Sequence, residues 1–195
     1  MKTGILGGTF DPPHMGHILL AQSAKNELQL DRIVLLPSAN PPHKTTHTSG
    51  EHRLEMAKLV ANEYGFELCD SEYKKETPSY TVETIDELKK IYLGDKLYFI
   101  IGGDSMMCFE KWYKWQELLK KCAFVAGVRS EGEREILKKI AIEKNRDYNG
   151  EIYILENPAH SVSSTEIRQG ESIEEIPQCI ISYIKEHSLY EGLIL

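Results

Sequence analysis

His14 and His17 are the two side chains near the start of the chain that could act on a bound anion. They follow a short β-compatible run, residues 2–6, and a Gly7-Gly8 pair that lets the backbone turn sharply and approach a bound group. A strand, a glycine turn and a helix N-terminus together bind phosphate, because unpaired backbone N–H groups and the positive end of the helix dipole face the anion. Histidines three residues apart share a face of a helix that begins near His14. The segment therefore predicts a nucleotide phosphate site with two imidazoles directed into it, and Gly16 between them leaves space for a ligand.

Each part of this pattern also has an ordinary structural explanation. A Gly-Gly turn after a strand is common, and a lone histidine at a helix start is usually a surface or capping residue. The combination of two histidines, the glycine between them and the strand-turn context favours the functional interpretation. The glycine spacing differs from the dinucleotide-binding pattern G-x-G-x-x-G and from a P-loop that ends in Gly-Lys-Ser/Thr.

The bulk composition is that of an ordinary globular protein. The 195 residues are 41% hydrophobic and 27% charged, and the formal net charge is −7. We expect no nucleic-acid partner, because an acidic chain is poorly suited to neutralising many phosphates. No apolar run reaches the roughly 18 residues that span a membrane, and the first residues lack the features of a signal peptide. The four scattered cysteines indicate reduced, mostly buried thiols in a cytoplasmic protein.

Strand and helix patterns alternate along the chain. The patterns predict strands at residues 2–6, 32–36, 66–69, 96–101, 123–128 and 151–155, and helices at 15–30, 51–64, 82–92, 133–145 and from Pro177 onward. This alternation predicts an α/β fold, a Rossmann-like doubly wound parallel sheet with right-handed crossovers. We expect a single domain over residues 1–195, in which about 160–195 form a small C-terminal helical cap.

A second glycine turn, Gly102-Gly103-Asp104-Ser105, follows the strand at 96–101. In an open parallel sheet, ligands bind outside the carboxyl ends of the strands. Trp112, Tyr113 and Trp115 come next in the chain, and such an aromatic cluster is either core or a platform on which a heterocycle stacks. The residues alone leave both explanations open.

Three other polar segments also have a structural and a functional explanation. The long loop at 38–50 is a surface connection or a lid, and Lys44 in it, taken by itself, is best explained as a solvated side chain. Residues 72–77 are expected to be a charged loop, after which Ser79 or Thr81 caps the next helix. The hydroxyl-rich segment 161–168 is a set of helix caps or, because its arginine can bind phosphate oxygens bidentately, an anion clamp.

The segment 7–17, with its His-x-Gly-His core, resembles the signature of the nucleotidyltransferase superfamily, and so does Ser-Ser-Thr-Glu-Ile-Arg at 163–168. Between them lie Pro-Pro-His-Lys (41–44), Pro-Ser-Tyr-Thr (78–81), Gly-Gly-Asp (102–104) and Trp-Tyr (112–113). The order of these motifs over almost the whole chain is similar to that of the bacterial nicotinate-nucleotide adenylyltransferases. One departure is Lys74-Lys75 before Pro-Ser-Tyr-Thr, where that family often has an arginine, whose planar fork a lysine does not reproduce.

This resemblance implies adenylyl transfer from ATP to nicotinate mononucleotide, which yields deamido-NAD and pyrophosphate. The mononucleotide phosphate would attack the α-phosphorus of ATP in line, without a covalent intermediate, so that the protein supplies positioning and charge stabilisation. Mg²⁺ would accompany ATP and be held by its phosphates and water, with no metal-binding residues on the protein. The implied partners are the two substrates and no membrane, and the sequence leaves a homodimer open.

The resemblance also implies roles for individual residues. Those assigned to ATP are Gly7, Gly8, Thr9 and Phe10 on the adenosine side, His14 and His17 at the phosphates, Gly102, Asp104 at the ribose, and Ser164, Thr165 and Arg168 at the β- and γ-phosphates. Catalysis is assigned to His17 first, with His14 and Arg168. Those assigned to nicotinate mononucleotide are Asn40 and Lys44 at its phosphate, Trp112 as stacking platform, and backbone N–H groups near Thr81 and Tyr113 at the ring carboxylate.

The nearest alternatives are other members of the superfamily. Pantetheine-phosphate adenylyltransferases and glycerol-phosphate cytidylyltransferases share the two end motifs, but Pro-Ser-Tyr-Thr and Trp112-Tyr113 favour the nicotinate enzymes. Nicotinamide mononucleotide is a rival substrate that the sequence separates poorly from nicotinate mononucleotide. An inactive nucleotide-sensing module on this fold is the alternative from another class, and the presence of both histidines, Lys44 and Arg168 argues against it.

Overall fold

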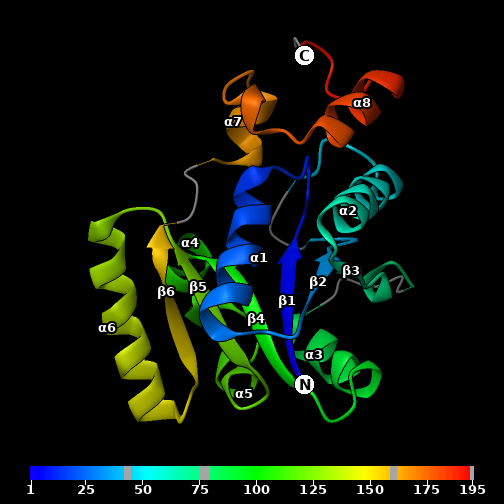
Figure 1. The fold of residues 1–195 in the computed structure, drawn as a ribbon. Helices are drawn as coiled ribbons and strands as arrows, with labels where there is room; N and C mark the ends of the chain where they lie inside the picture. Colours follow the sequence, from blue (N-terminus) through cyan, green and yellow to red (C-terminus); the bar gives the residue numbers. More distant parts are fainter. Residues whose placement is uncertain (42–44, 75–79, 159–161, 194–195) are drawn as a thin grey trace. The chain divides into compact units, whose positions relative to one another are not determined.

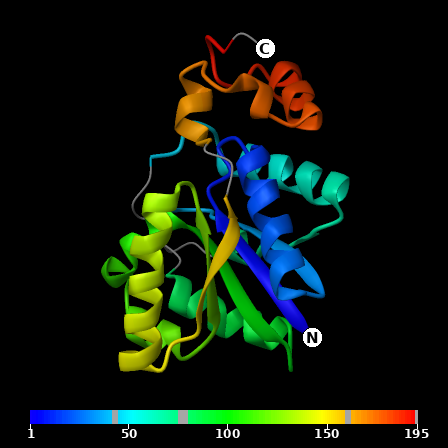
Figure 2. The same ribbon diagram turned by 60° about the vertical axis from the view of Figure 1, so that its left-hand side comes forward.

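The computed structural model describes residues 1–41, 45–74, 80–158 and 162–193, and for 157 and 158 the backbone alone. Within these residues a six-stranded parallel sheet has the order β3-β2-β1-β4-β5-β6 (Figures 1 and 2). The strands are β1 (Lys2–Gly8), β2 (Arg32–Pro37), β3 (Glu67–Leu68), β4 (Lys96–Gly102), β5 (Ala123–Val128) and β6 (Ile152–Pro158). In this order β2 and β3 lie on one side of β1, and β4, β5 and β6 lie on the other side. This is the strand order of a doubly wound sheet. The predicted fold class is therefore confirmed.

The central strands are apolar because both of their faces are covered. Every residue of β5 is buried, and so are the five from Leu97 to Ile101 in β4. Gly4 in β1 leaves room for three aliphatic side chains, since a Cβ there would lie 2.7 Å from Ile33 and 2.8 Å from Leu30. The central strands are therefore continuous hydrophobic segments of the sequence. This explains why their positions could be predicted from the sequence.

The chain forms two compact units. The first comprises residues 1–6, 20–33 and 80–159, and the second 7–19, 34–79 and 160–195. The first holds β4–β6 and the elements α3 (Thr81–Ile91), α4 (Gly103–Met107), η2 (Phe109–Lys111), α5 (Trp115–Leu119) and α6 (Glu131–Tyr148). The second holds α2 (Gly50–Tyr64), β3, η1 (Ser71–Lys74), α7 (Ser164–Arg168), η3 (Ile173–Glu175) and α8 (Gln178–Glu186), while α1 (Met15–Leu28) has residues in both. The expectation of a single domain stays a prediction.

Side-chain caps explain where several helices begin. Ser49, Ser130 and Ser163 each accept a backbone N–H from the first turn of α2, α6 and α7. At α3 the expectation was wrong for Thr81, because Tyr80 is the N-cap, its side chain makes no capping hydrogen bond, and Thr81 is already helical. Ser79, the other candidate cap, lies outside the described residues.

Two other expectations need correction. The segment predicted as a loop from residue 72 is in part a short 3₁₀ helix, η1, in which Glu72 is buried. Of the four thiols, Cys69 and Cys122 are buried and Cys179 is partly buried, but Cys108 is exposed. Burial raises the pKa of Cys122 and of Cys179 to about 12, at Cys179 with a further contribution from Glu63. These two thiols are therefore protonated and unreactive at neutral pH.

No helix in the described part of the chain has both the length and the apolar character that crossing a bilayer requires.

Candidate active site

The loop after β1 is shaped around the ring of Phe10. This residue is 1% exposed and has a positive φ of 51°, a backbone conformation that is uncommon for a residue with a side chain. A Cβ on Gly8 would lie 3.0–3.3 Å from three carbons of the Phe10 ring. Gly8 is thus needed for Phe10 to fold back beneath the loop. The peptide bond between Asp11 and Pro12 is cis, and α1 then begins at Met15.

The two histidines lie against each other, as their spacing predicts. Their ring centroids are 3.8 Å apart, and the backbone N–H of His14 donates to Nδ1 of His17 at 3.3 Å. Because Nδ1 is the acceptor, a neutral His17 ring carries its proton on Nε2. His14 is buried and His17 is half-buried, with its ring 5.0 Å from that of Phe10 in an edge-on arrangement. The first turn of α1 therefore presents a hydrogen-bond donor from His17.

Gly16 serves a different purpose from the one expected. A Cβ there would lie 2.8 Å from Cγ1 of Val162 and 2.9 Å from Nδ1 of His14. The space above this glycine is filled by the protein, so the prediction that it leaves room for a ligand is wrong. The glycine instead allows residue 162, just before α7, to approach the start of α1.

The hydroxyl-rich segment at 163–168 is joined to the loop after β1. Ser163 forms a capping box with Glu166 at the start of α7. Ser164 Oγ donates to the carbonyl of Pro12 at 2.8 Å, and Arg168 Nη1 donates to the carbonyl of Asp11 at 2.5 Å. Arg168 Nη2 also donates to Thr165 Oγ1 at 3.1 Å. The capping and the functional explanations of this segment are thus compatible, since the same residues start a helix and bind to the loop that carries the histidines.

Asp11 organises three segments, although the sequence analysis gave it no role. Its buried carboxylate accepts the His47 N–H, the Thr48 hydroxyl and the Tyr190 hydroxyl, each at 2.7 Å. The pKa of Tyr190 is raised, first by burial and further by the hydrogen bond to Asp11, so Tyr190 remains a donor at neutral pH. Asp11 could have been suspected from its place in the glycine–histidine motif. Nothing in the sequence marks Tyr190.

A cavity of about 500 Å³ lies beside Arg168, with His47, His52 and Tyr190 among its lining residues. His52 Nδ1 is 2.9 Å from the Tyr183 hydroxyl. The loop at 47–49, the start of α2 and the segment at 188–191 thus enclose a space that adjoins an arginine of the predicted phosphate-binding motif.

Arg53 on α2 is a second residue that the sequence analysis missed. It is 1% exposed, and its guanidinium donates to the backbone carbonyls of Thr9, Ser38 and Ala39. A signal did exist, because Arg53 is in phase with the buried positions Met56, Ala57 and Val60 of the same helix. A charged residue on a buried stripe requires a partner.

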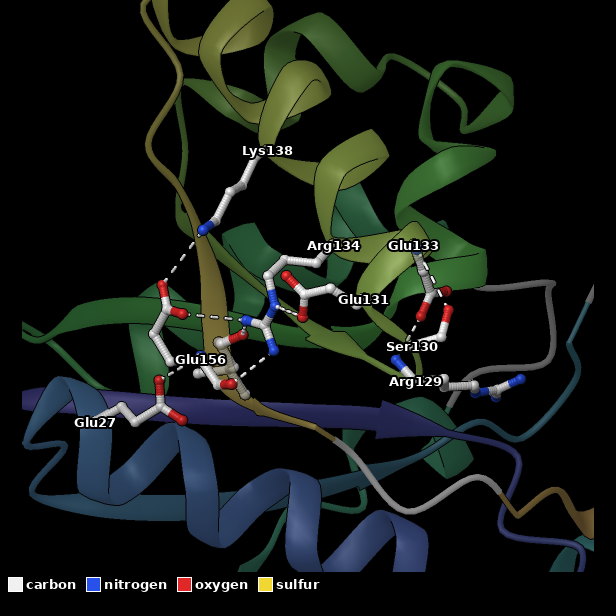
Figure 3. Close-up of polar contacts among 9 residues, drawn as sticks. Glu27, Arg129, Ser130, Glu131, Glu133, Arg134, Lys138 and Glu156 are labelled. Carbon is white, nitrogen blue, oxygen red and sulfur yellow. Dashed lines mark hydrogen bonds and ion pairs between the residues drawn. The ribbon is translucent and has the colours of Figure 1, made fainter.

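In the other compact unit, the glycine turn after β4 is constrained by carboxylates. A Cβ on Gly102 would lie 2.6 Å from Asp104 Oδ1, and one on Gly103 would lie 2.5 Å from Glu133 Oε1. Glu133 Oε2 also accepts the backbone N–H of Arg129 at 2.5 Å (Figure 3). Asp104 is exposed, accepts the Ser105 N–H, and lies 3.9 Å from the Arg129 guanidinium. This turn presents an exposed carboxylate and an arginine together.

The aromatic cluster divides between the two explanations. Trp115 is half-buried and packs edge-on against Phe109 and Tyr148. Trp112 is half-buried and lies 5.5 Å from Phe109 by ring centroids, whereas Tyr113 is 50% exposed. The Tyr113 ring is 4.6 Å from that of Tyr80, which precedes the helix begun by Thr81. The unit thus presents exposed aromatic side chains beside the N-terminus of α3.

The predicted site residues fall into two groups. Gly7 to Phe10, both histidines, Asn40, Ser164, Thr165 and Arg168 belong to the second unit, and Thr81, Gly102, Asp104, Trp112 and Tyr113 belong to the first. Asn40 is exposed directly beyond β2. Lys44 lies outside the described residues.

The strand order and the histidine-bearing loop at the end of β1 define a Rossmann-like nucleotidyltransferase. Residues 5–170 match the family model described as cytidylyltransferase-like. Two relatives are named probable nicotinate-nucleotide adenylyltransferase. The protein from Shewanella pealeana is 39% identical to this chain, and the match covers 98% of this chain and 97% of the relative. The protein from Carboxydothermus hydrogenoformans is 37% identical, and the match covers 97% of this chain and 98% of the relative. The chain belongs to the nicotinate-nucleotide adenylyltransferase family.

Solved structures agree with the fold. The Plasmodium falciparum nicotinic acid mononucleotide adenylyltransferase complexed with NaAD superposes with a TM-score of 0.78 at 21% identity, covering 98% of each chain. The same enzyme complexed with APC gives 0.76 at 21% identity over 97% of each chain.

Proposed function

We propose that this protein transfers the adenylyl group of MgATP to nicotinate mononucleotide, which yields deamido-NAD and pyrophosphate in NAD biosynthesis. The observation that carries the proposal is the joining of the two signature segments, through the bonds from Ser164 and Arg168 to the carbonyls of Pro12 and Asp11. These bonds attach a cation and a hydroxyl-rich helix start to the loop that contains His14 and leads into the first turn of α1, which contains His17. The names of the full-length relatives support the choice of substrate.

In the proposed reaction a phosphate oxygen of the mononucleotide attacks the α-phosphorus of ATP in line, and the bond from that phosphorus to the bridging oxygen breaks. No covalent intermediate is formed, so the protein acts by positioning and by stabilising negative charge. His17 donates from Nε2 to a phosphate oxygen, because Nδ1 is engaged by the backbone of His14. His14, Thr165 and Arg168 hold the remaining phosphate oxygens, and Ser164, whose hydroxyl donates to the Pro12 carbonyl, does so only if ATP takes the place of that carbonyl. Gly7 to Phe10 lie along the adenosine, and Gly102 and Asp104 meet the ribose.

The donor set fits a Mg²⁺ that enters with ATP. In the part of the chain that the structure describes, no group of three or more histidine, cysteine, aspartate or glutamate residues could hold a metal ion. The buried carboxylate of Asp11 is already engaged by three donors. We therefore assign the ion to the triphosphate oxygens and water, where it neutralises charge on the substrate.

For the nicotinate half, Trp112 serves as the stacking platform, and backbone N–H groups at Thr81 and Tyr113 bind the ring carboxylate. The start of α3 supports this, because the first N–H groups of a helix have no partner within it and attract anions. Asn40 and Lys44 meet the mononucleotide phosphate. The reaction takes place in the cytoplasm, and assembly as a homodimer is compatible with it.

The test is pyrophosphate release from MgATP with nicotinate mononucleotide, nicotinamide mononucleotide or phosphopantetheine supplied separately. We expect release with nicotinate mononucleotide at a clearly higher kcat/KM than with the other two. Release only with another acceptor would support adenylyl transfer as the reaction but refute nicotinate mononucleotide as the substrate. Release with none of them, from protein that binds ATP, would favour the inactive nucleotide-sensing module.

A further inference from the structure

Arg53 places a positive charge inside the second compact unit, where backbone carbonyls surround it. Its side chain leaves α2 and is 1% exposed. Nη1 donates to the carbonyl of Thr9 at 3.1 Å and also to that of Ser38, and Nη2 donates to the carbonyl of Ala39 at 2.7 Å. Removing a guanidinium from water is costly unless its N–H groups are satisfied; both Nη groups of Arg53 have partners, while the buried Nε has none among the described residues. These three carbonyls are therefore fixed relative to one another by a group that cannot turn away to solvent.

The three carbonyls belong to two different loops. Thr9 is in the loop after β1, directly beyond the Gly7-Gly8 pair, and Ser38 and Ala39 follow β2 and directly precede Asn40. A backbone bond from the Ser38 N–H to the Gly8 carbonyl at 2.9 Å also joins these loops, and farther along the second loop the His47 N–H and the Thr48 hydroxyl donate to the Asp11 carboxylate at 2.7 Å. The Tyr73 hydroxyl adds a second, longer bond to the Ser38 carbonyl at 3.4 Å. The side chain of Arg53 thus donates hydrogen bonds to backbone carbonyls of both loops.

We infer that Arg53 is a positioning residue for both substrates: it holds the loop that binds the adenosine side of ATP in register with the loop that presents Asn40 to the mononucleotide phosphate. This inference rests on the proposed function, which assigns those two loops to the two substrates. The planar fork of arginine is suited to the task, because its donors have fixed directions. The single ammonium of a lysine cannot reach all three carbonyls in that geometry.

The chain supplies a matched control in Arg134 of α6. This arginine is also buried, and its guanidinium donates to two backbone carbonyls within β6, those of Leu155 at 2.8 Å and Glu156 at 2.7 Å (Figure 3). Its side chain also bonds to the carboxylates of Glu131 and Glu156. The proposed function assigns no substrate contact to any of these residues. Arg134→Lys therefore also removes a buried guanidinium group, but it changes no contact with either of the two loops that the proposed function assigns to substrates.

The experiment compares Arg53→Lys and Arg134→Lys with the wild-type protein. For each, thermal unfolding is followed first, and steady-state pyrophosphate release is then measured at the same interval below each melting temperature. MgATP affinity is measured by calorimetry in parallel, because that readout needs no acceptor. A third variant, Tyr73→Phe, removes only the hydroxyl bond to the Ser38 carbonyl.

We expect Arg53→Lys to raise KM for both ATP and nicotinate mononucleotide about tenfold each, as the loss of one hydrogen bond from a charged donor would. The change in kcat should be smaller, since none of the hydrogen bonds described above for His17 and Arg168, which are assigned to the ATP phosphates, involves Arg53. Tyr73→Phe should raise KM for the mononucleotide alone, by about two- to threefold. Arg134→Lys should lower the melting temperature and leave both KM values within twofold of the wild type.

Two results would overturn the inference. One is an Arg53→Lys protein that unfolds earlier but keeps wild-type KM values and MgATP affinity, which would make Arg53 a purely structural residue. The other is an equal rise of KM in Arg134→Lys, which would trace the effect to general loosening. If the wild type binds MgATP without using nicotinate mononucleotide, the proposed function fails by itself, and the calorimetry still decides the role of Arg53.

Discussion

Replacing Tyr190 by phenylalanine should lower the free energy of unfolding of the protein, although the change removes only one oxygen atom. The hydroxyl donates to the carboxylate of Asp11 at 2.7 Å and is 3.5 Å from the Thr48 hydroxyl. A hydrogen bond to a charged, buried acceptor contributes about 1.5–3 kcal/mol. Taking about 2 kcal/mol, and about 2 kcal/mol per molar for the dependence on urea, the midpoint of unfolding should fall by about 1 M. The melting temperature should fall by about 4–8 °C.

The assay is urea denaturation of Tyr190→Phe, Asp11→Asn and the double variant, with Tyr153→Phe as control. Tyr153 also donates to a carboxylate, that of Glu151 at 2.5 Å, but that carboxylate is partly exposed, so this change should cost less than about 1 kcal/mol. The coupling free energy between Tyr190 and Asp11 should exceed about 1 kcal/mol. A coupling near zero, or a midpoint for Tyr190→Phe equal to that of the wild type, would show that the contact does not stabilise the loop after β1.

Three further predictions concern catalysis and pH. His17→Ala should lower kcat about a hundredfold or more while the melting temperature stays near that of the wild type, and normal turnover would remove His17 from the mechanism. Trp112→Ala should raise KM for nicotinate mononucleotide with little change in KM for ATP, and an unchanged mononucleotide KM would exclude stacking on this ring. The pKa of Asp95 is lowered, chiefly by a hydrogen bond from the Thr3 hydroxyl. The stabilisation that Asp95 provides is therefore complete above the ordinary carboxyl pKa and is lost as the pH falls through the lowered pKa. Asp95→Asn should make the free energy of unfolding depend less on pH in this acidic range. An unchanged dependence would contradict the prediction.

The fold could be predicted because its signals are local and repeated. Strand β5 is buried at every residue and α2 carries a regular buried stripe, so both patterns are visible in the sequence. Helix ends were predicted less accurately. At α3 the N-cap is Tyr80, which makes no side-chain capping bond, and α6 begins at Glu131 after an ordinary serine cap, Ser130, two residues before the expected start.

The candidate site was only partly predictable. The close approach of the His14 and His17 rings, with centroids 3.8 Å apart, was predictable from their three-residue spacing, but the roles of Gly16, Arg53 and Tyr190 were not. Each of those depends on a neighbour that is distant in sequence: Val162 over Gly16, two loops around Arg53, and Asp11 opposite Tyr190. Periodicity describes only the near neighbours of a residue: it places Arg53 on the buried stripe of α2 but cannot show which loops its side chain joins, and it does not mark Tyr190 at all.

The bonds that complete the loop after β1 also have a consequence for the order of folding during synthesis. Pro12 is separated from Ser164 by 152 positions, Asp11 from Arg168 by 157, and Asp11 from Tyr190 by 179. The loop leaves the ribosome well before the hydroxyl and guanidinium groups that donate to its carbonyls and its carboxylate have been made. Contacts of such long sequence separation form late, because closing so large a loop of chain costs entropy before any bond is gained. A nascent chain halted before residue 164 would therefore carry the whole histidine motif with its His47, Thr48 and Arg53 contacts, but would lack the donors from Ser164, Arg168 and Tyr190.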